Sequence, residues 1–196
     1  MKKNLSRIIL VVVVIILLIS GSSLIVNFNK GRRDVFDVEI SENEIVKTKY
    51  YDFDDGTFSI KLPVDFKLMN TERVMLKYPN EKKPNIVYTN EDASINVAIN
   101  LTDLDVSSVK EYTNLVRSTF DPIYKDVVIN IFDYEGHQIG EVKLISPAEG
   151  EYIYNHMIFF TMDGKLRIIN FNCTSELQNN WVKVGDFIMD SLVFND

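Results

Sequence analysis

Few residues of this 196-residue chain have the types and spacing that catalysis requires. Ser107 and Lys110 have the Ser-x-x-Lys spacing of penicillin-recognising enzymes, in which the serine is the nucleophile. The companion motifs of those enzymes are missing from the sequence, and both residues also suit the first turn of an amphipathic helix. A Gly-x-Ser-x-Gly elbow, a phosphate-binding loop and a His-Glu-x-x-His helix are missing as well. We therefore predict no catalytic residues, no cofactor and no enzymatic activity.

The residues that commonly bind metal ions are scattered along the chain. Cys173 is the only cysteine, and His137 and His156 lie too far apart in sequence to have ligand spacing. Residues 52–56 read DFDDG, which resembles a calcium-binding loop, but Gly56 stands where the third oxygen ligand should be. We therefore predict no metal site, a solvated turn at 52–56 and a buried apolar role for Cys173.

The strongest candidates for a binding role lie in the aromatic segment 152–162. Its alternation places Tyr152, Tyr154 and His156 on one face of a strand. Aromatic side chains dominate the hot spots of protein interfaces, so these three residues form a candidate partner-binding patch. The competing interpretation is that His156 and its neighbours belong to the core or to a covered sheet surface.

The elements that would hold this patch are mainly strands. Alternation over Phe58–Leu62, ended by Pro63, predicts a half-buried strand. Further strands are expected at 74–78, 85–89, 93–101, 126–132, 139–145, 152–162 and 166–171. The pair Asp163-Gly164 predicts a two-residue hairpin turn. Short turns between consecutive strands require antiparallel pairing.

Two helices are expected to cover the sheet. Apolar residues recur at helical spacing over 106–120, and Asp105 is the predicted N-cap. A final helix is predicted over 176–192, with Trp181 on its buried face. One antiparallel sheet covered by helices satisfies the apolar faces of all these elements.

The N-terminal segment predicts a membrane anchor. Residues 8–28 read IILVVVVIILLISGSSLIVNF and carry no charge, and about 20 apolar residues are enough to cross a bilayer as a helix. A cleaved signal peptide is the alternative, with 8–19 as its apolar core and 20–22 as its cleavage site. The apolar run resumes at 24–26, which favours an uncleaved anchor or uncleaved signal.

The flanks of this segment bear on its orientation. Residues 1–7 are a short basic tail, but basic residues also follow the span at 30–33, so the charges on the two sides nearly balance. A basic tail followed by an apolar core is typical of export signals. We therefore expect a single-pass protein of the cell membrane with its C-terminal domain extracytoplasmic. Residues 29–56 are predicted to form a polar stalk with a short helix near 35–45, and 57–196 to form the globular domain.

The charge balance bears on the class of partner. Residues 1–28 hold three of the 21 basic residues and none of the 28 acidic ones, which leaves 18 basic and 28 acidic residues and a net charge of −10. Such a surface repels phosphate backbones, so we expect no nucleic acid partner.

The order of these segments resembles a known superfamily. The relevant stretches are FSIKLPVDFK at 58–67, NIVYTNEDASINVAINLT at 85–102 and ELQNNWVKVGDFIMDSLVF at 176–194, with an amphipathic helix and an antiparallel meander between the last two. Together they resemble the PsbP-like superfamily over Thr57–Phe194. The resemblance implies an α+β fold, an α/β/α sandwich with a central antiparallel β-sheet, here preceded by one N-terminal transmembrane helix. It also implies a non-enzymatic adaptor or assembly subunit, and it assigns no binding residues.

We therefore expect a membrane-anchored bacterial member of this superfamily that binds an unknown protein partner of the cell envelope. Bacterial lipoproteins of the superfamily carry a lipidated cysteine where this chain reads LLISGSS, so residues 8–28 would provide the anchor instead. Two alternatives stay open. One is an envelope hydrolase whose site forms only in three dimensions, and the other is a calcium- or solute-binding protein with an acidic surface.

Overall fold

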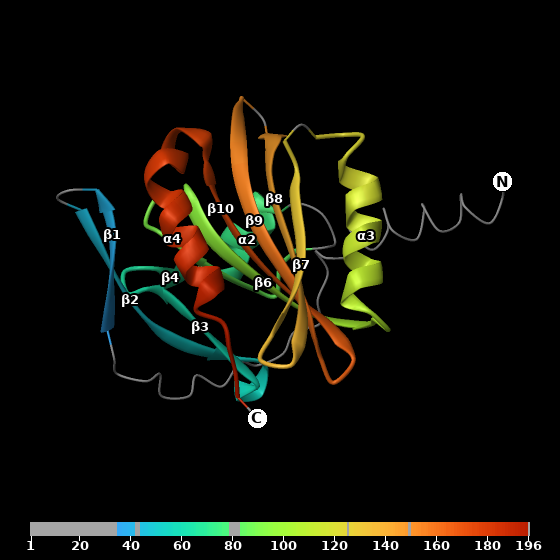
Figure 1. Ribbon diagram of the computed structural model, residues 1–196. Coiled ribbons are helices and arrows are strands. Elements are labelled where there is room, and N and C mark those ends of the chain that lie inside the picture. Colours follow the sequence, from blue (N-terminus) through green and yellow to red (C-terminus); the bar gives the residue numbers. More distant parts are fainter. Residues whose placement is uncertain (1–34, 42–43, 79–82, 125, 149, 196) are drawn as a thin grey trace.

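The computed structural model describes residues 35–41, 44–78, 83–124, 126–148 and 150–195, which form two antiparallel sheets and three α-helices (Figure 1). The larger sheet consists of β4 Lys67–Leu68, β5 Ile86–Thr89, β6 Ile95–Asp105, β10 Lys165–Thr174, β9 Glu151–Met162, β8 His137–Ala148 and β7 Val128–Tyr134, in that spatial order. The smaller sheet consists of β1 Val35–Ser41, β2 Glu44–Phe53, β3 Phe58–Pro63 and β11 Val193–Phe194, in that order.

The seven-stranded sheet is the central layer of the domain. Helix α4 (Gln178–Asp190) and the smaller sheet pack on one face of it, where Phe58 and Phe171 are fully buried. Helix α3 (Val109–Phe120) covers β8, β9 and β10 on the opposite face, and α2 (Thr71–Lys77) covers β5 and β6 there. The predicted α+β class and the antiparallel sheet with helices on both faces are confirmed, but a second sheet was not predicted.

Much of the segment predicted to be a stalk is built into the smaller sheet. Residues 35–41 and 44–53 form β1 and β2, and β2 pairs antiparallel with β3, so the predicted short helix near 35–45 is wrong. Lysines conceal the alternation in the sequence. Lys49 shares a face of β2 with Tyr51, and its Nζ lies 5.0 Å from the centre of that ring. Phe53, farther along the same face, is buried against Phe58.

The strand predicted at 74–78 is wrong, because these residues lie in and beside helix α2. Asn70 is the N-cap, and its side-chain oxygen accepts a hydrogen bond from the N–H of Arg73 at 2.8 Å. Val74 is the buried residue of this helix, while Leu76 points into solvent. A short apolar run does not by itself separate a strand from a helix, and here the cap decides the outcome.

Helix α3 begins later than predicted. Strand β6 continues through Asp105, which was the expected N-cap, and the observed cap is Ser108. The hydroxyl of Ser108 accepts a hydrogen bond from the N–H of Glu111 at 3.3 Å. Ser107 therefore precedes the N-cap, and Lys110 lies in the first turn of α3. This agrees with the prediction that both residues belong to the start of an amphipathic helix.

The predicted hairpin at Asp163-Gly164 is confirmed and fixes the register of the central strands. Both residues have positive φ, 51° and 74°, as a tight turn of this kind requires. The turn joins β9 to β10 and places His156 opposite Phe171.

The predicted transmembrane helix at 8–28 lies outside the residues that the structure describes. Within the ranges given above, no helix is both long and apolar enough to cross a membrane.

Candidate functional site

Helix α4 carries an acidic side chain over the middle of the large sheet. Val184 and Ile188 are buried in the core, and Gly185 lies directly on Phe171 of β10. A Cβ atom at Gly185 would come within 2.5 Å of the Phe171 ring, so a larger residue would have to push the helix or the ring aside. This close approach lets Asp186, the next residue, reach side chains of β8 and β9.

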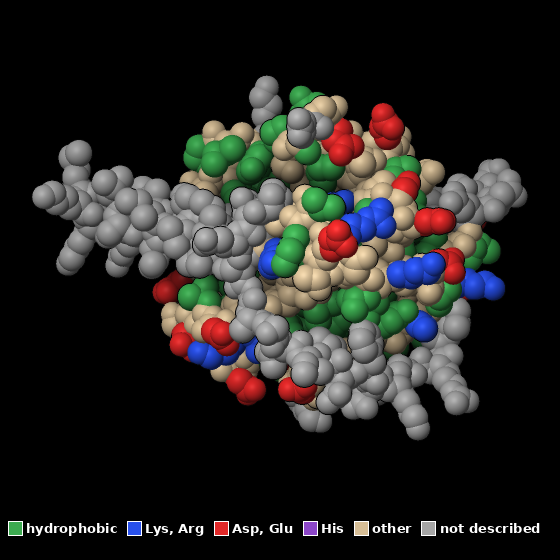
Figure 2. All heavy atoms as spheres, turned by 180° about the vertical axis from the view of Figure 1, so that it is seen from behind, with side chains coloured by type: hydrophobic (Ala, Val, Ile, Leu, Met, Phe, Trp, Pro, Cys, Tyr) green, Lys and Arg blue, Asp and Glu red, His purple; other side chains and the backbone are tan. Residues whose placement is uncertain are grey.

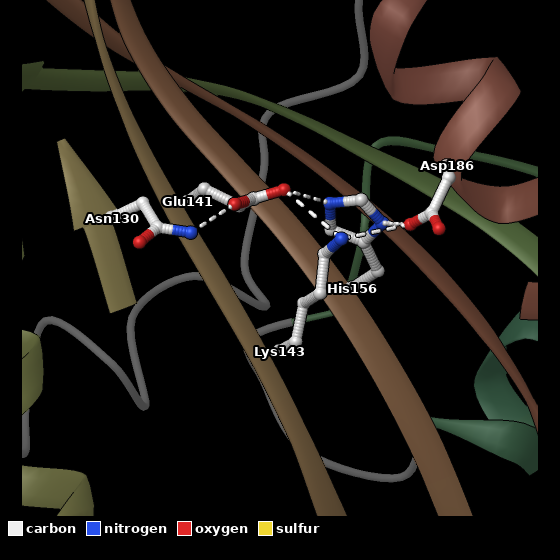
Figure 3. Close-up of polar contacts among 5 residues, drawn as sticks. All are labelled: Asn130, Glu141, Lys143, His156 and Asp186. Atoms are coloured by element: carbon white, nitrogen blue, oxygen red, sulfur yellow. Dashed lines mark hydrogen bonds and ion pairs between the residues drawn. The ribbon is translucent and has the colours of Figure 1, made fainter. Parts of the chain in front are cut away.

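Asp186 joins a compact charged network (Figure 3). Strand register places Glu141, Lys143 and His156 on the sheet face beneath α4. Glu141 Oε1 lies 2.8 Å from His156 Nε2, and Asp186 Oδ1 lies 3.1 Å from His156 Nδ1. Lys143 Nζ lies 2.9 Å from Asp186 Oδ1 and 3.4 Å from Glu141 Oε1. From β7, Asn130 Nδ2 donates a hydrogen bond to Glu141 Oε2 at 2.7 Å.

The pKa of each of these groups is shifted in the direction that favours its charged form. Burial opposes the charge of His156, but Asp186 and Glu141 outweigh it and raise the pKa of the ring above its usual value. The hydrogen bond to His156 lowers the pKa of Glu141 to about 2, and the same ring lowers the pKa of Asp186. Burial also opposes the charge of Lys143, yet Asp186 and Glu141 raise its pKa.

The network is suited to holding charge rather than to moving protons. A carboxylate beside each ring nitrogen favours the imidazolium form of His156, in which both nitrogens carry a proton and neither keeps a lone pair. The Nδ1 contact with Asp186 is close but poorly aligned for a hydrogen bond, so it acts as an ion pair. His156 is only 1% exposed. The arrangement therefore fastens α4 to the sheet.

The residues of the predicted patch differ in exposure. Tyr152, Tyr154 and His156 alternate on one face as predicted, but Tyr154 and His156 are buried and Tyr152 is exposed. Tyr154 packs on Phe171, with the ring centres 6.5 Å apart. The three side chains therefore do not form one exposed patch, and the competing core interpretation describes Tyr154 and His156.

Other apolar side chains are exposed on that same sheet face. Val128, Phe132 and Tyr134 alternate along β7, and with Ile145 of β8 and Tyr152 of β9 they are between 37% and 59% exposed. Strand register places Ile145 diagonally next to both Val128 and Tyr152. We call these five residues the apolar strip. Among the described strands β7 pairs with β8 alone, so β7 is an edge strand of the sheet (Figure 1), and three of the five residues of the strip belong to it.

Sequence reasoning missed Glu141, Lys143 and Asp186 as members of the network. A signal for the first two was present in the alternation of charged residues with Val142 and Leu144 along β8. In a sheet with one face open to solvent, alternating charged residues such as these point into water. Here helices cover both faces of the sheet, so buried charged side chains need oppositely charged or hydrogen-bonding partners. Asp186 gave no local signal.

The predicted turn at 52–56 and the lone thiol have structural roles. The carboxylate of Asp54 accepts a hydrogen bond from Arg167 Nε at 2.6 Å, which ties the turn to β10. Cys173 is free and buried, as predicted, and burial raises its pKa to about 11. In the part of the chain that the structure describes, no group of three or more His, Cys, Asp or Glu side chains could hold a metal ion.

On the side of the molecule opposite to the view of Figure 1, basic and acidic side chains do not form separate patches. Figure 2 shows that face, where Lys and Arg side chains lie interspersed with Asp and Glu. Nucleic acid is normally bound by a continuous basic stripe, and the described side chains seen on this face do not form one.

Comparison with known proteins finds similar structures. No protein-family model and no curated protein matches the sequence. The solution structure of cyanobacterial PsbP (CyanoP) from Synechocystis matches with a TM-score of 0.53 and 9% sequence identity, and the match covers 79% of this chain and 96% of that one. The chain has the PsbP fold. The resemblance predicted from the sequence is thus confirmed at the level of the fold.

Two further structures are similar. A protein from Bacteroides thetaiotaomicron has a TM-score of 0.50 and 13% identity, with 75% of this chain and 48% of that one covered. LpqN, involved in cell envelope biogenesis of Mycobacterium tuberculosis, has a TM-score of 0.48 and 9% identity, with 77% of this chain and 92% of that one covered. At 9% identity the match to CyanoP shows the fold alone and assigns no activity.

Proposed function

We propose that this chain is a non-enzymatic protein-binding module, held at the cell membrane by residues 8–28 with its PsbP-fold domain outside the cytoplasm. The apolar strip carries the proposal, because large apolar side chains exposed together mark interaction surfaces. The uncharged run of residues 8–28 supports the tether. The burial of His156 between two carboxylates supports a role without catalysis.

The strip suits an extended segment of a protein partner. Among the described strands none pairs with the outer edge of β7, so an added strand could pair there, and main-chain hydrogen bonds would supply part of the affinity. Alternate apolar side chains of that segment would then lie on Val128, Phe132 and Tyr134. The net charge of −10 on residues 29–196 favours a partner with basic residues beside this segment, because opposite charge speeds encounter.

Site-specific crosslinking in living cells tests the strip. A photoreactive residue at Phe132 of the full-length chain should capture one major protein, whereas the same residue at Ile123 should not. Ile123 is a matched control because it is also a large exposed apolar side chain, and it lies beyond α3 on the other side of the sheet. Phe132→Asp should abolish capture from position 152 without lowering the thermal stability. Equal capture at Phe132 and Ile123, or capture at neither, would contradict the proposal.

Cell fractionation tests the tether and the orientation. The full-length chain should sediment with membranes and resist extraction by alkaline carbonate, and protease added to spheroplasts should digest the domain. Recovery of the full-length chain from the soluble fraction would refute the tether. A domain that protease reaches only after lysis would refute the orientation.

A further inference from the structure

A small pocket lies under α3, on the face of the large sheet opposite α4. Its volume is about 170 Å³. The floor includes the cross-strand row Ala98, Asn170 and Met157 from β6, β10 and β9. Tyr112 and Val116 of α3 form part of the wall. The sheet separates this pocket from the apolar strip, so the two surfaces are independent.

Three polar atoms of the pocket residues have no hydrogen-bond partner among the residues that the structure describes: the hydroxyls of Tyr78 and Tyr112 and the side-chain oxygen of Asn170. The proposal rests on the last two, which belong to α3 and β10 on either side of the pocket. Tyr112 is 5% exposed and burial raises its pKa, so the phenol stays protonated and can donate. Asn170 directs its amide N–H to Asn155 Oδ1 at 3.3 Å, which leaves its own oxygen as a free acceptor. Buried polar groups without partners are unfavourable, and a ligand that supplies both partners would relieve that cost.

The remaining lining is largely apolar. Phe120, Phe159 and Ile168 contribute to it, and no acidic or basic side chain from the described ranges does. A carboxylate or an ammonium group would be buried there without an opposite charge, which is strongly unfavourable. An engineered cavity of about 150 Å³ in another protein binds benzene. The pocket therefore has room for one aromatic ring with a small neutral substituent.

We propose that this pocket binds a neutral aromatic amide, or a similar small planar molecule that has one donor and one acceptor on a single polar group. The carbonyl of the ligand accepts a hydrogen bond from the Tyr112 hydroxyl, and its N–H donates to Asn170 Oδ1. The ring lies among Met157, Phe159 and Ile168. The module would thus carry a small-molecule site in addition to its protein-binding strip.

Benzamide is the probe that tests this site. The full-length chain is held in lipid nanodiscs, and the methyl NMR signal of Met157 reports on the floor of the pocket. Benzamide at millimolar concentration should shift this signal saturably. Toluene has the ring without the polar group and should bind more weakly than benzamide. Benzoate has nearly the same shape but is charged, and it should leave the signal in place.

A single variant separates polar recognition from simple filling of a cavity. Tyr112→Phe keeps the ring and removes the hydroxyl, so it should weaken benzamide about five- to tenfold, the equivalent of one hydrogen bond, and leave toluene unchanged. A thermal unfolding curve verifies that the variant folds. Three results would overturn the proposal: an unmoved Met157 signal with benzamide, a benzoate shift as large as that of benzamide, or an equal loss of benzamide and toluene affinity in the variant.

Discussion

Neutralising Glu141 should change how the stability of the domain depends on pH. Its side chain is 15% exposed, and folding lowers its pKa from 4.5 to about 2, chiefly through the hydrogen bond to His156. A lowered pKa stabilises the folded state at pH values above the unfolded pKa, and this stability is lost as the pH falls through the folded pKa. At about 1.36 kcal/mol for each pKa unit, Glu141 contributes about 3 kcal/mol. Most of this contribution should disappear between pH 4.5 and pH 2.

Urea unfolding of the full-length chain in detergent micelles measures this effect. Trp181, the only tryptophan, stacks on Phe66 with the ring centres 5.9 Å apart, so its fluorescence reports on the packing of α4. Glu141→Gln should lower the free energy of unfolding by roughly 3 kcal/mol near neutral pH and flatten its decline in acid. Asp133→Asn, a substitution at an exposed residue of the neighbouring strand β7, is the matched control. It should change neither the free energy of unfolding at neutral pH nor its decline in acid.

The histidine should produce the opposite dependence. Its pKa is raised on folding, so its charge stabilises the fold fully below pH 6.5, and this stability is lost as the pH rises through the folded pKa. His156→Leu should remove that decline at higher pH. If Glu141→Gln instead has the same acid slope as the parent chain, the network is too well screened to stabilise α4, and the reasoning is refuted.

Two other substitutions and one chemical treatment probe the packing of the domain. Gly185→Ala should lower the free energy of unfolding by about 1–3 kcal/mol in a calorimetric scan, because its methyl group would overlap the ring of Phe171. Arg167→Met should cost about 3 kcal/mol in the urea assay, because Asp54 loses the cation that lies 2.6 Å away. Cys173 should react with iodoacetamide at about pH 8 only after denaturation, because the thiolate form is buried and scarce; rapid labelling of the folded chain would contradict its burial.

Features governed by local geometry were predictable from the sequence. The pair Asp163-Gly164 specifies its turn because both residues adopt positive φ easily, whatever surrounds them in the fold. Helix α3 and its buried face followed from spacing alone, although its first residue did not, since Ser108 and Asp105 are equally good caps until β6 is seen to continue. Strands β1 and β2 were missed because their stability comes from pairing: β2 pairs with β3 across the intervening turn, and β1 pairs with β2.

The charged network was beyond prediction because it depends on register and on helix docking at once. Glu141 and His156 are 15 residues apart on two long strands, and a shift of one residue in either strand would turn one of them to the other face. Asp186 reaches them only because Gly185 lets α4 approach Phe171. Neither condition can be read from the spacing of acidic residues and histidines.

Of the three residues predicted to form a partner-binding patch, only Tyr152 is exposed. Alternation correctly placed Tyr152, Tyr154 and His156 on one face, but α4 covers the middle of that face and leaves β7 and the end of β9 open. Edge strands are usually protected by charged residues or proline, since an apolar edge invites aggregation. Strand β7 exposes Val128 and Phe132 there instead. A protein with such an edge stays dispersed when another segment occupies it, and this supports the proposal that a partner binds the apolar strip and not the buried histidine.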